Sequence, residues 1–283
     1  MARSAPAQTF SAMYRVFCQP AKHVEVAETY AETNGIGVLT GVLDRNELRR
    51  VREVVTRAME AKASAAAKPA DPAYGNAGSP NVHLTDLVLG DPVFRELLEH
   101  EVALRLVRHL LGPNIRLSDF TANIVLPGAE AMEMHADQGY VTTPWPDWPL
   151  SVTIVWVIDN FTAETGATRV KPDSGRYDHG PESNLPYPEA QPLACPAGSI
   201  IALDGRIWHQ SGPNTTERTR RIALFATYVR PFILPRIDWR ERVPPDLRDT
   251  LTPGLREMLG FEVRATEHRL TRFGRQIWPN EQK

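Results

Sequence analysis

The sequence predicts a mainly β protein whose β core is flanked by helices. Helical periodicity dominates before Pro113, whereas short apolar or alternating segments follow one another from there to about residue 233. Gly, Pro, Asn and Asp separate these segments, as in a sandwich or barrel. Helices followed by a block of strands favour one domain over residues 1–283, with a helical part at about 24–112, a β core at about 113–233 and a C-terminal extension at 234–283.

Charge and composition exclude several classes of partner. The 283 residues carry a net charge of −2 with a pI near 6.5, so we expect no basic surface for nucleic acid or an anionic membrane. The longest apolar runs, such as 151–158, are too short to cross a bilayer. Two cysteines, Cys18 and Cys195, are too few for a disulfide framework, which predicts a soluble, cytoplasmic protein. The segment 1–24 has basic but no acidic side chains, as organelle presequences do, and we rank this reading below the cytoplasmic one.

Capping patterns locate the first elements of the helical part. Residues 24–34 form a short predicted helix that ends at Gly35, and a strand is expected at 36–43. Asp44 and Glu47 have the spacing of a capping box, ahead of apolar residues at helical intervals. This pattern predicts a helix that packs one apolar stripe against a sheet.

A change of composition interrupts the helical part at 62–79, which is rich in Ala, Pro, Gly and Asn. We expect a surface loop there, and in an enzyme it can serve as a lid. Asp91 and Pro92 then repeat the cap-and-proline start of a helix, and one or two amphipathic helices are expected up to Gly112. The extension after residue 234 predicts short helices and a polar tail.

The β core contains six candidate strands and two long connections. The connections, 139–150 and 173–198, are of a length that usually carries function. The candidate strands, apolar or alternating in character, are 115–126, 131–137, 151–159, 166–171, 199–204 and 220–229.

Three residues of the β core have the chemistry of metal ligands. His135 and Asp137 stand two positions apart, and on a strand such side chains leave the same face about 6 to 7 Å apart. His209 provides a second imidazole from a later segment. Each residue alone has an ordinary structural explanation, but two imidazoles and one carboxylate together form the facial arrangement of non-haem Fe(II) oxygenases.

An arginine begins the last apolar segment of the core. Arg220 follows His209 by eleven residues, and an inward guanidinium there needs a partner, because an unpaired buried charge is costly. A dicarboxylate cosubstrate would supply that partner through a two-pronged hydrogen bond. Strand alternation allows only one of Arg220 and Arg221 to face inward.

Three segments in combination resemble the phytanoyl-CoA dioxygenase family of Fe(II)/2-oxoglutarate-dependent oxygenases. They are His135-Ala-Asp137, DNFTAETGATRVKPDSG at 159–175 and HQSGPNTTERTRR at 209–221. The resemblance extends from about residue 28 to 232. It implies a double-stranded β-helix, the jelly-roll, cupin-like core of this superfamily.

The resemblance also implies the ligands and cofactors of the site. Fe(II) would be held by His135, Asp137 and His209, and dioxygen and 2-oxoglutarate would be consumed. Two departures affect the surroundings of the metal: the glutamine that several relatives have three residues before the first histidine is Met132 here, and the family's PGSH turn is Pro-Asp-Ser-Gly at 172–175.

The cosubstrate site follows from the same resemblance. Arg220 would hold the distal carboxylate of 2-oxoglutarate, with Thr168 and Ser211 assisting. Arg221 is the alternative if the preceding turn carries an extra residue.

The implied reaction is oxidation of an unactivated C–H bond of a small apolar molecule, as in a tailoring step of secondary metabolism. Because Asp137 is present, no ligand position is vacated for chloride, which favours hydroxylation over halogenation. Desaturation, epoxidation and rearrangement stay open. An acyl-CoA substrate is disfavoured because no cluster of basic residues is available for its phosphates.

Candidate substrate contacts come from two regions. Tyr140, Trp145 and Trp148 follow the ligand pair, and large flat side chains suit an apolar ligand. Asn81 and His83, after the 62–79 segment, can approach the cosubstrate from outside the barrel.

Two other functions stay open at this stage. A zinc-dependent hydrolase or isomerase on a cupin-like barrel also uses histidines and a carboxylate. A non-catalytic jelly-roll binding module would use the histidines structurally. The sequence also leaves the oligomeric state open, a homodimer included.

Overall fold

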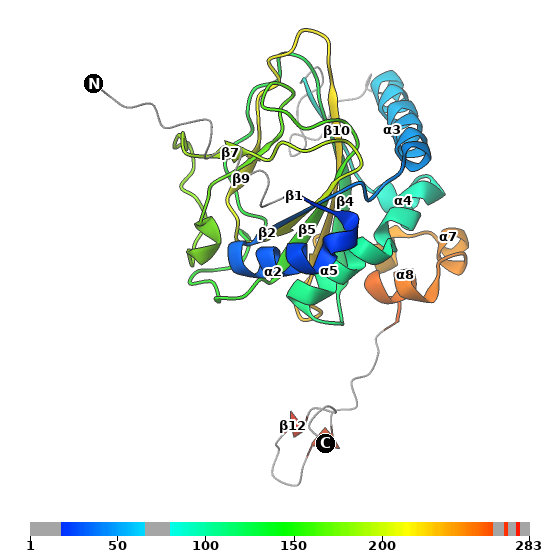
Figure 1. Cartoon of the computed structure of the whole chain (residues 1–283). Coiled ribbons are helices and arrows are strands. Elements are labelled where there is room, and N and C mark those ends of the chain that lie inside the picture. The colour runs from blue at the N-terminus through cyan, green and yellow to red at the C-terminus, as the bar shows by residue number, and fades with distance from the viewer. Residues whose placement is uncertain (1–17, 66–79, 263–268, 271–275, 278–283) are drawn as a thin grey trace. The chain divides into compact units, whose positions relative to one another are not determined.

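The computed structural model describes residues 18–65, 80–262, 269–270 and 276–277 (Figure 1). The presequence-like segment lies almost entirely outside this part, and so does most of the 62–79 segment expected to form a loop or lid. The chain divides into two compact units, 1–237 and 238–283. The boundary between them falls close to residue 234, where the C-terminal extension is expected to begin.

The second unit contains the short helices expected for the extension. Their N-termini are capped locally; Thr252, for example, accepts a hydrogen bond from the Leu255 amide at 3.1 Å. Its described elements are α6 (Trp239–Arg242), α7 (Pro245–Asp249), α8 (Pro253–Met258), β11 (Arg269–Leu270) and β12 (Gln276–Ile277).

Seven described strands form the larger sheet of the first unit. They are β1 (Cys18–Pro20), β2 (Ile36–Thr40), β3 (Asn81–Leu84), β4 (Arg116–Val125), β5 (Ser151–Val157), β8 (Ile200–Asp204) and β10 (Arg221–Val229). Their order is β1-β2-β8-β5-β10-β4-β3, and neighbours are antiparallel except β1 and β2. Every residue of β5 is buried, because both faces of the sheet are covered.

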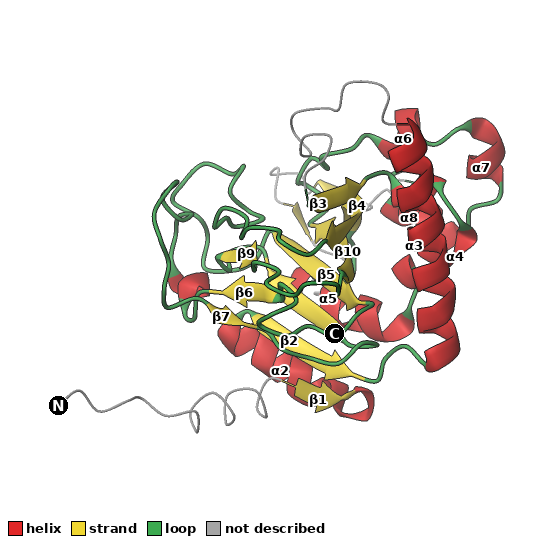
Figure 2. Cartoon of the chain, turned by 90° about the horizontal axis from the view of Figure 1, so that it is seen from above, coloured by secondary structure: helices red, strands yellow, loops and turns green. Residues whose placement is uncertain are grey.

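A smaller sheet faces the larger one (Figure 2). It contains β6 (Thr168–Val170), β7 (Gln191–Pro192) and β9 (His209–Ser211) in the order β7-β6-β9. Apolar side chains of both sheets form one core cluster, including Val155 and Val170. Two facing sheets of mainly antiparallel strands form the jelly-roll core expected from the sequence.

Helices of the first unit pack against the larger sheet. The helices of this unit are α2 (Val24–Asn34), α3 (Arg45–Ala65), α4 (Pro92–Leu98) and α5 (Glu101–Leu111), with single 3-10 turns at Ala21–His23, Leu87–Leu89 and Ser174–Arg176. Helix α2 packs on β2, and α5 packs on α2 and β5 (Figure 2). None of the helices that the structure describes combines the length and apolar composition needed to cross a membrane.

The predicted caps are confirmed. The Asp44 amide donates to Glu47 Oε2 at 2.7 Å and the Glu47 amide donates to Asp44 Oδ1 at 2.9 Å, which is the reciprocal capping box. Asp91 caps α4 by accepting from the Val93 amide at 3.0 Å. Helix α2 ends at Gly35, whose φ of 75° is left-handed.

Three expectations about the elements are wrong. The segment 131–137 is not a strand; its backbone bonds β9 at the isolated bridge between His135 and His209 and through the Met132 amide, which donates to the Ser211 carbonyl at 3.0 Å. Residues 62–65 belong to α3 rather than to a loop. The strands β1, β3 and β7 were not predicted, since segments of two to four residues are too short to display a periodicity.

Candidate metal centre

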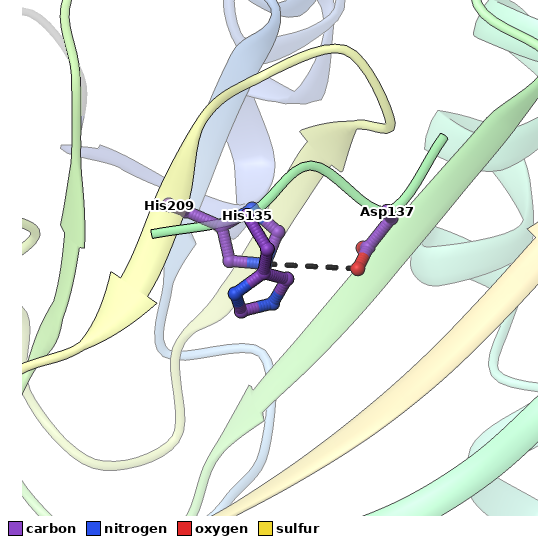
Figure 3. A group of neighbouring side chains, drawn as sticks. All are labelled: His135, Asp137 and His209. Atoms are coloured by element: carbon purple, nitrogen blue, oxygen red, sulfur yellow. Dashed lines mark ion pairs between the residues drawn. The ribbon is translucent and has the colours of Figure 1, made fainter. Parts of the chain in front are cut away.

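Three side chains from two segments of the first unit converge between the sheets (Figure 3). His209 is the first residue of β9, and His135 lies opposite it in the connection between β4 and β5. The amide of each histidine donates to the carbonyl of the other, at 2.9 Å and 2.8 Å. This backbone bridge places the centroids of the two imidazole rings 4.4 Å apart. The bridge, rather than the strand expected at 131–137, therefore brings the two histidines together.

Second hydrogen bonds fix the orientation of both imidazoles. Nδ1 of His135 lies 2.9 Å from the carbonyl oxygen of Glu133, and Nδ1 of His209 lies 2.9 Å from that of Ile207. A carbonyl only accepts, so each Nδ1 carries the proton and each Nε2 presents a free lone pair. Burial, followed by the neighbouring His209, lowers the pKa of His135, which favours the neutral ring that a metal requires.

Asp137 provides the third donor. Its Oδ1 lies 3.7 Å from Nε2 of His209, drawn as a dashed line in Figure 3, and its Oδ2 accepts from the Thr153 hydroxyl at 2.5 Å. Burial by itself raises the pKa of Asp137, but the two histidines and the Thr153 hydrogen bond together lower it. The carboxylate is therefore ionised at neutral pH.

The donor set fits a non-haem Fe(II) ion. One ligand atom from each of the three residues lies within 4.8 Å of the other two, close enough to meet on one ion. Two imidazoles and one carboxylate would occupy one face of an octahedron and leave the opposite face for other ligands.

The arginine that is buried beside Ser211, at the other end of β9 from His209, is Arg221 and not Arg220. The inward position expected for Arg220 is wrong: its Nη2 donates to Thr56 on α3 at 2.8 Å. Arg221 is fully buried, its Nη1 donates to Asn123 Oδ1 at 3.0 Å, and its Nη2 also donates to the Ser211 hydroxyl. The alternative that strand alternation left open therefore applies.

The carbonyl of Gly166 holds the other edge of the Arg221 guanidinium. It accepts from Nε at 3.1 Å and from Nη2 at 2.7 Å. Within the described residues Arg221 forms no ion pair, and Asp159, the acid that acts on it electrostatically, is bound to Arg52 at 2.9 Å. Burial lowers the pKa of Arg221, so an anion beside it would be strongly favoured.

Asn123 is a site residue that the sequence analysis missed. Its Nδ2 lies 2.5 Å from Asn81 Oδ1 and 3.1 Å from His83 Nε2, while its Oδ1 accepts from Arg221. Asn81 and His83 thus reach the arginine through Asn123 rather than from outside the barrel. Burial lowers the pKa of His83, helped by the positive charges of Lys62 and Arg221. The sequence signal was the polar alternation Asp, Thr, Asn at 119, 121 and 123 within an apolar strand.

The two predicted cosubstrate helpers lie at the same end of the smaller sheet. Ser211 contacts Arg221 directly, and buried Thr168 is its register partner on β6. His209 and Ser211 are two positions apart on β9, so their side chains leave the same face about 6 to 7 Å apart. That separation matches the length of a five-carbon dicarboxylate.

The three aromatic candidates have different positions. Trp145 is buried against Met134 and Trp208, and its Nε1 donates to the Val141 carbonyl at 2.8 Å. It therefore packs in the core beside the segment that carries His135. Tyr140 is 49% exposed, and burial of its hydroxyl followed by the charge of Asp137 raises its pKa. Trp148, 42% exposed, stacks on Arg230 at 4.6 Å.

Comparison with known sequences identifies the family. The model of the phytanoyl-CoA dioxygenase (PhyH) family matches residues 31–222. The chain is 34% identical to dioxygenase af480 of Aspergillus fumigatus over 255 residues, covering 84% of this chain and 77% of that protein. It is 26% identical to the multifunctional dioxygenase ausE of Emericella nidulans over 264 residues, covering 85% of each.

Solved structures agree on the fold. HygX from Streptomyces hygroscopicus, determined with nickel, 2-oxoglutarate and hygromycin B, superposes with a TM-score of 0.57 at 16% identity, covering 74% of this chain and 88% of HygX. The α-ketoglutarate-dependent carbocyclase SnoK from nogalamycin biosynthesis superposes with a TM-score of 0.59 at 18% identity, covering 75% of this chain and 86% of SnoK. With the family match over two thirds of the sequence, the chain belongs to the phytanoyl-CoA dioxygenase family, whose members are non-haem iron, 2-oxoglutarate-dependent dioxygenases.

Proposed function

We propose that this protein uses Fe(II) and 2-oxoglutarate to oxidise an unactivated C–H bond of a small apolar molecule, in a tailoring step of secondary metabolism. One observation carries the proposal. Two imidazoles and a carboxylate converge at one end of β9, and at its other end Ser211 contacts the buried guanidinium of Arg221, which has no acidic partner among the described residues. A metal ion satisfies the first group and a dianionic cosubstrate satisfies the second.

In this proposal His135, Asp137 and His209 hold the iron. The two Nδ1 hydrogen bonds fix the orientation of both rings, and Thr153 holds one oxygen of Asp137. When bound, iron and 2-oxoglutarate supply an oxidant strong enough to take a hydrogen atom from an aliphatic carbon. The protein contributes positioning and the exclusion of water.

Arg221 replaces Arg220 as the proposed anchor of the distal carboxylate. Its guanidinium is already oriented by Gly166 and Asn123, so binding an anion there requires little side-chain ordering. Ser211 donates its hydroxyl proton to the same carboxylate, and Thr168 lies beside it. We further propose that the Asn123 amide takes the part of the glutamine that Met132 lacks.

The substrate is proposed to approach beside Tyr140 and Trp148. Both aromatic side chains are largely exposed on the connection that follows Asp137, where an apolar ligand gains contact area at little entropic cost. Trp145, which belongs to the same connection, is buried and anchors it to the core. Hydroxylation is the favoured outcome; related solved proteins are named as an epimerase and a carbocyclase, so rearrangement is the alternative outcome of the same oxidant.

An anaerobic titration tests the proposal. Protein with Fe(II) and 2-oxoglutarate should develop a visible charge-transfer absorption, and with oxygen it should release succinate. The same protein loaded with Zn(II) should show neither. A protein that hydrolyses or isomerises a substrate with Zn(II), and gives no absorption with Fe(II) and 2-oxoglutarate, would be the zinc enzyme instead, and one that binds no metal would be a non-catalytic module.

Two further predictions concern the whole protein. We propose a reducing, cytoplasmic location, because two cysteines, Cys18 and Cys195, are too few for a disulfide framework. A homodimer is consistent with the sequence, and light scattering of the purified protein tests it.

A further inference from the structure

Three polar side chains form a row across neighbouring strands on the inner face of the larger sheet. Thr227 of β10 pairs in register with Asp119 of β4 on one side and with Thr153 of β5 on the other. The hydroxyl oxygens of Thr153 and Thr227 are 3.0 Å apart, and Thr227 also hydrogen-bonds the Asp119 carboxyl. The row ends at the metal cluster, because Thr153 bonds Oδ2 of Asp137.

Counting protons gives the row a direction. An ionised carboxylate only accepts, so the single hydroxyl proton of Thr153 goes to Asp137. Thr153 is then the acceptor in its contact with Thr227, whose single proton can go either to Thr153 or to the Asp119 carboxylate. Every link is satisfied at once when the Asp119 carboxyl carries a proton, and the hydroxyl of Thr153 cannot rotate away without leaving a buried polar atom unpaired.

The surroundings of Asp119 favour its protonated form. Asp119 is 8% exposed, and burial raises its pKa to about 6, although Arg236, with Nη1 at 3.5 Å, and the hydrogen bond from Thr227 oppose the shift. The charge of Asp137 adds to the rise. The same two groups, Arg236 and Asp137, are the charges that face Asp119 from the segment after β10 and from the metal cluster.

We propose that Asp119, Thr227 and Thr153 are positioning residues that keep Oδ2 of Asp137 occupied, so that this carboxylate binds the metal through Oδ1 alone. The inference rests on the proposed function. Oδ1 is the oxygen that lies 3.7 Å from Nε2 of His209, on the side of the other ligands. A carboxylate that used both oxygens would occupy one of the three positions that the cosubstrate and dioxygen need.

Co(II) binding in the absence of cosubstrate tests the row without relying on turnover. Thr153→Val keeps the branched shape and removes the hydroxyl, and we expect it to weaken Co(II) binding by about tenfold or more, as losses around metal ligands do. It should also change the visible spectrum of bound Co(II), which reports the number and arrangement of ligand atoms. Thr153→Ser, which restores the hydroxyl, should return both values toward wild type.

Thr227→Val tests the second link, since Thr227 does not touch Asp137. We expect an affinity between those of wild type and Thr153→Val, with the spectrum shifted in the same direction. Thr40→Val on β2, whose hydroxyl donates to the Gln19 carbonyl at 3.4 Å, is the matched control and should change neither value. Melting temperatures of the metal-free proteins establish that each variant is folded.

The outcomes separate the positioning role of the three residues from the proposed metal centre. Wild-type affinity and spectrum in both Thr153→Val and Thr227→Val would overturn the positioning role while leaving the metal centre intact. If Thr153→Val does not fold, Thr227→Val and Thr153→Ser decide alone. Failure of the wild-type protein to bind Co(II) would overturn the metal centre, and the positioning role with it.

Discussion

His135 and His209 are joined through their backbones: each amide donates to the other's carbonyl, at 2.9 Å and 2.8 Å. The pair of imidazoles is therefore brought together by folding before any metal binds. Replacing one ring leaves this bridge in place, so the contribution of a ligand can be removed without dismantling the site.

Removal of a ligand should abolish metal binding but not folding. We expect His209→Ala and Asp137→Ala to lose at least about 100-fold in Fe(II) affinity and to form succinate only at background rate, because two donors do not hold the ion. Calorimetry under anaerobic conditions measures the affinity. His23→Ala, at an exposed histidine, is the control. Substrate-coupled turnover in Asp137→Ala would remove this carboxylate from the mechanism.

The two adjacent arginines should differ in their effect on the cosubstrate. Arg221→Met removes a buried cation that would face a carboxylate, which typically costs about 3 kcal/mol, or more than 100-fold in the Kd of 2-oxoglutarate. Arg220→Met removes a contact with Thr56 on the outside and should leave that Kd unchanged. The Fe(II) charge-transfer absorption reports both titrations, and equal effects of the two variants would contradict the assignment.

Asp119→Asn should change the pH dependence of stability. The folded pKa of Asp119, about 6, lies above the ordinary aspartate value of 3.8, so ionisation is disfavoured in the folded state. Below pH 4 the Asp119 carboxyl is protonated in both the folded and the unfolded protein. As the pH rises from about 4 to 6, the unfolded protein ionises at Asp119 more readily than the folded protein, so the free energy of unfolding falls. The shift corresponds to at most about 3 kcal/mol.

The side chain of Asp119→Asn is neutral at every pH, so the variant does not lose this stability as the pH rises. The free energy of unfolding of Asp119→Asn should therefore exceed that of wild type at pH 8, and the difference should shrink toward zero at pH 4. Urea unfolding of metal-free protein at both pH values measures it. A difference independent of pH would show that Asp119 does not ionise with a raised pKa.

Gly166→Ala should weaken cosubstrate binding as well as the fold. Gly166 has a φ of 81°, and a Cβ there would lie 2.8 Å from the Gly212 carbonyl oxygen, so its backbone must shift. The left-handed conformation alone costs about 1–2 kcal/mol for alanine. Because the Gly166 carbonyl holds Arg221, we expect a lower melting temperature together with a higher Kd for 2-oxoglutarate; a change in the melting temperature alone would limit Gly166 to a structural role.

The sequence by itself determined the features that depend on local chemistry. The capping box at Asp44 and the left-handed stop at Gly35 were readable because each is decided by a few neighbouring residues. The identity of the three ligand candidates was also readable, since only certain side chains bind iron. The jelly-roll class followed from the block of strands together with the family resemblance.

Tertiary structure alone decided which arginine faces inward and how the histidines meet. The turn before β10 determines which side chains of that strand face inward. In this turn buried Asn214 bonds the carbonyls of Val125 and Thr219 at 3.0 Å and 2.8 Å, and the strand begins at Arg221. A shift of one residue exchanges the two faces of a strand, and alternation cannot show where counting starts. The bridge between His135 and His209 joins segments more than seventy residues apart, and such a pairing is set by the packing of the two sheets rather than by local pattern.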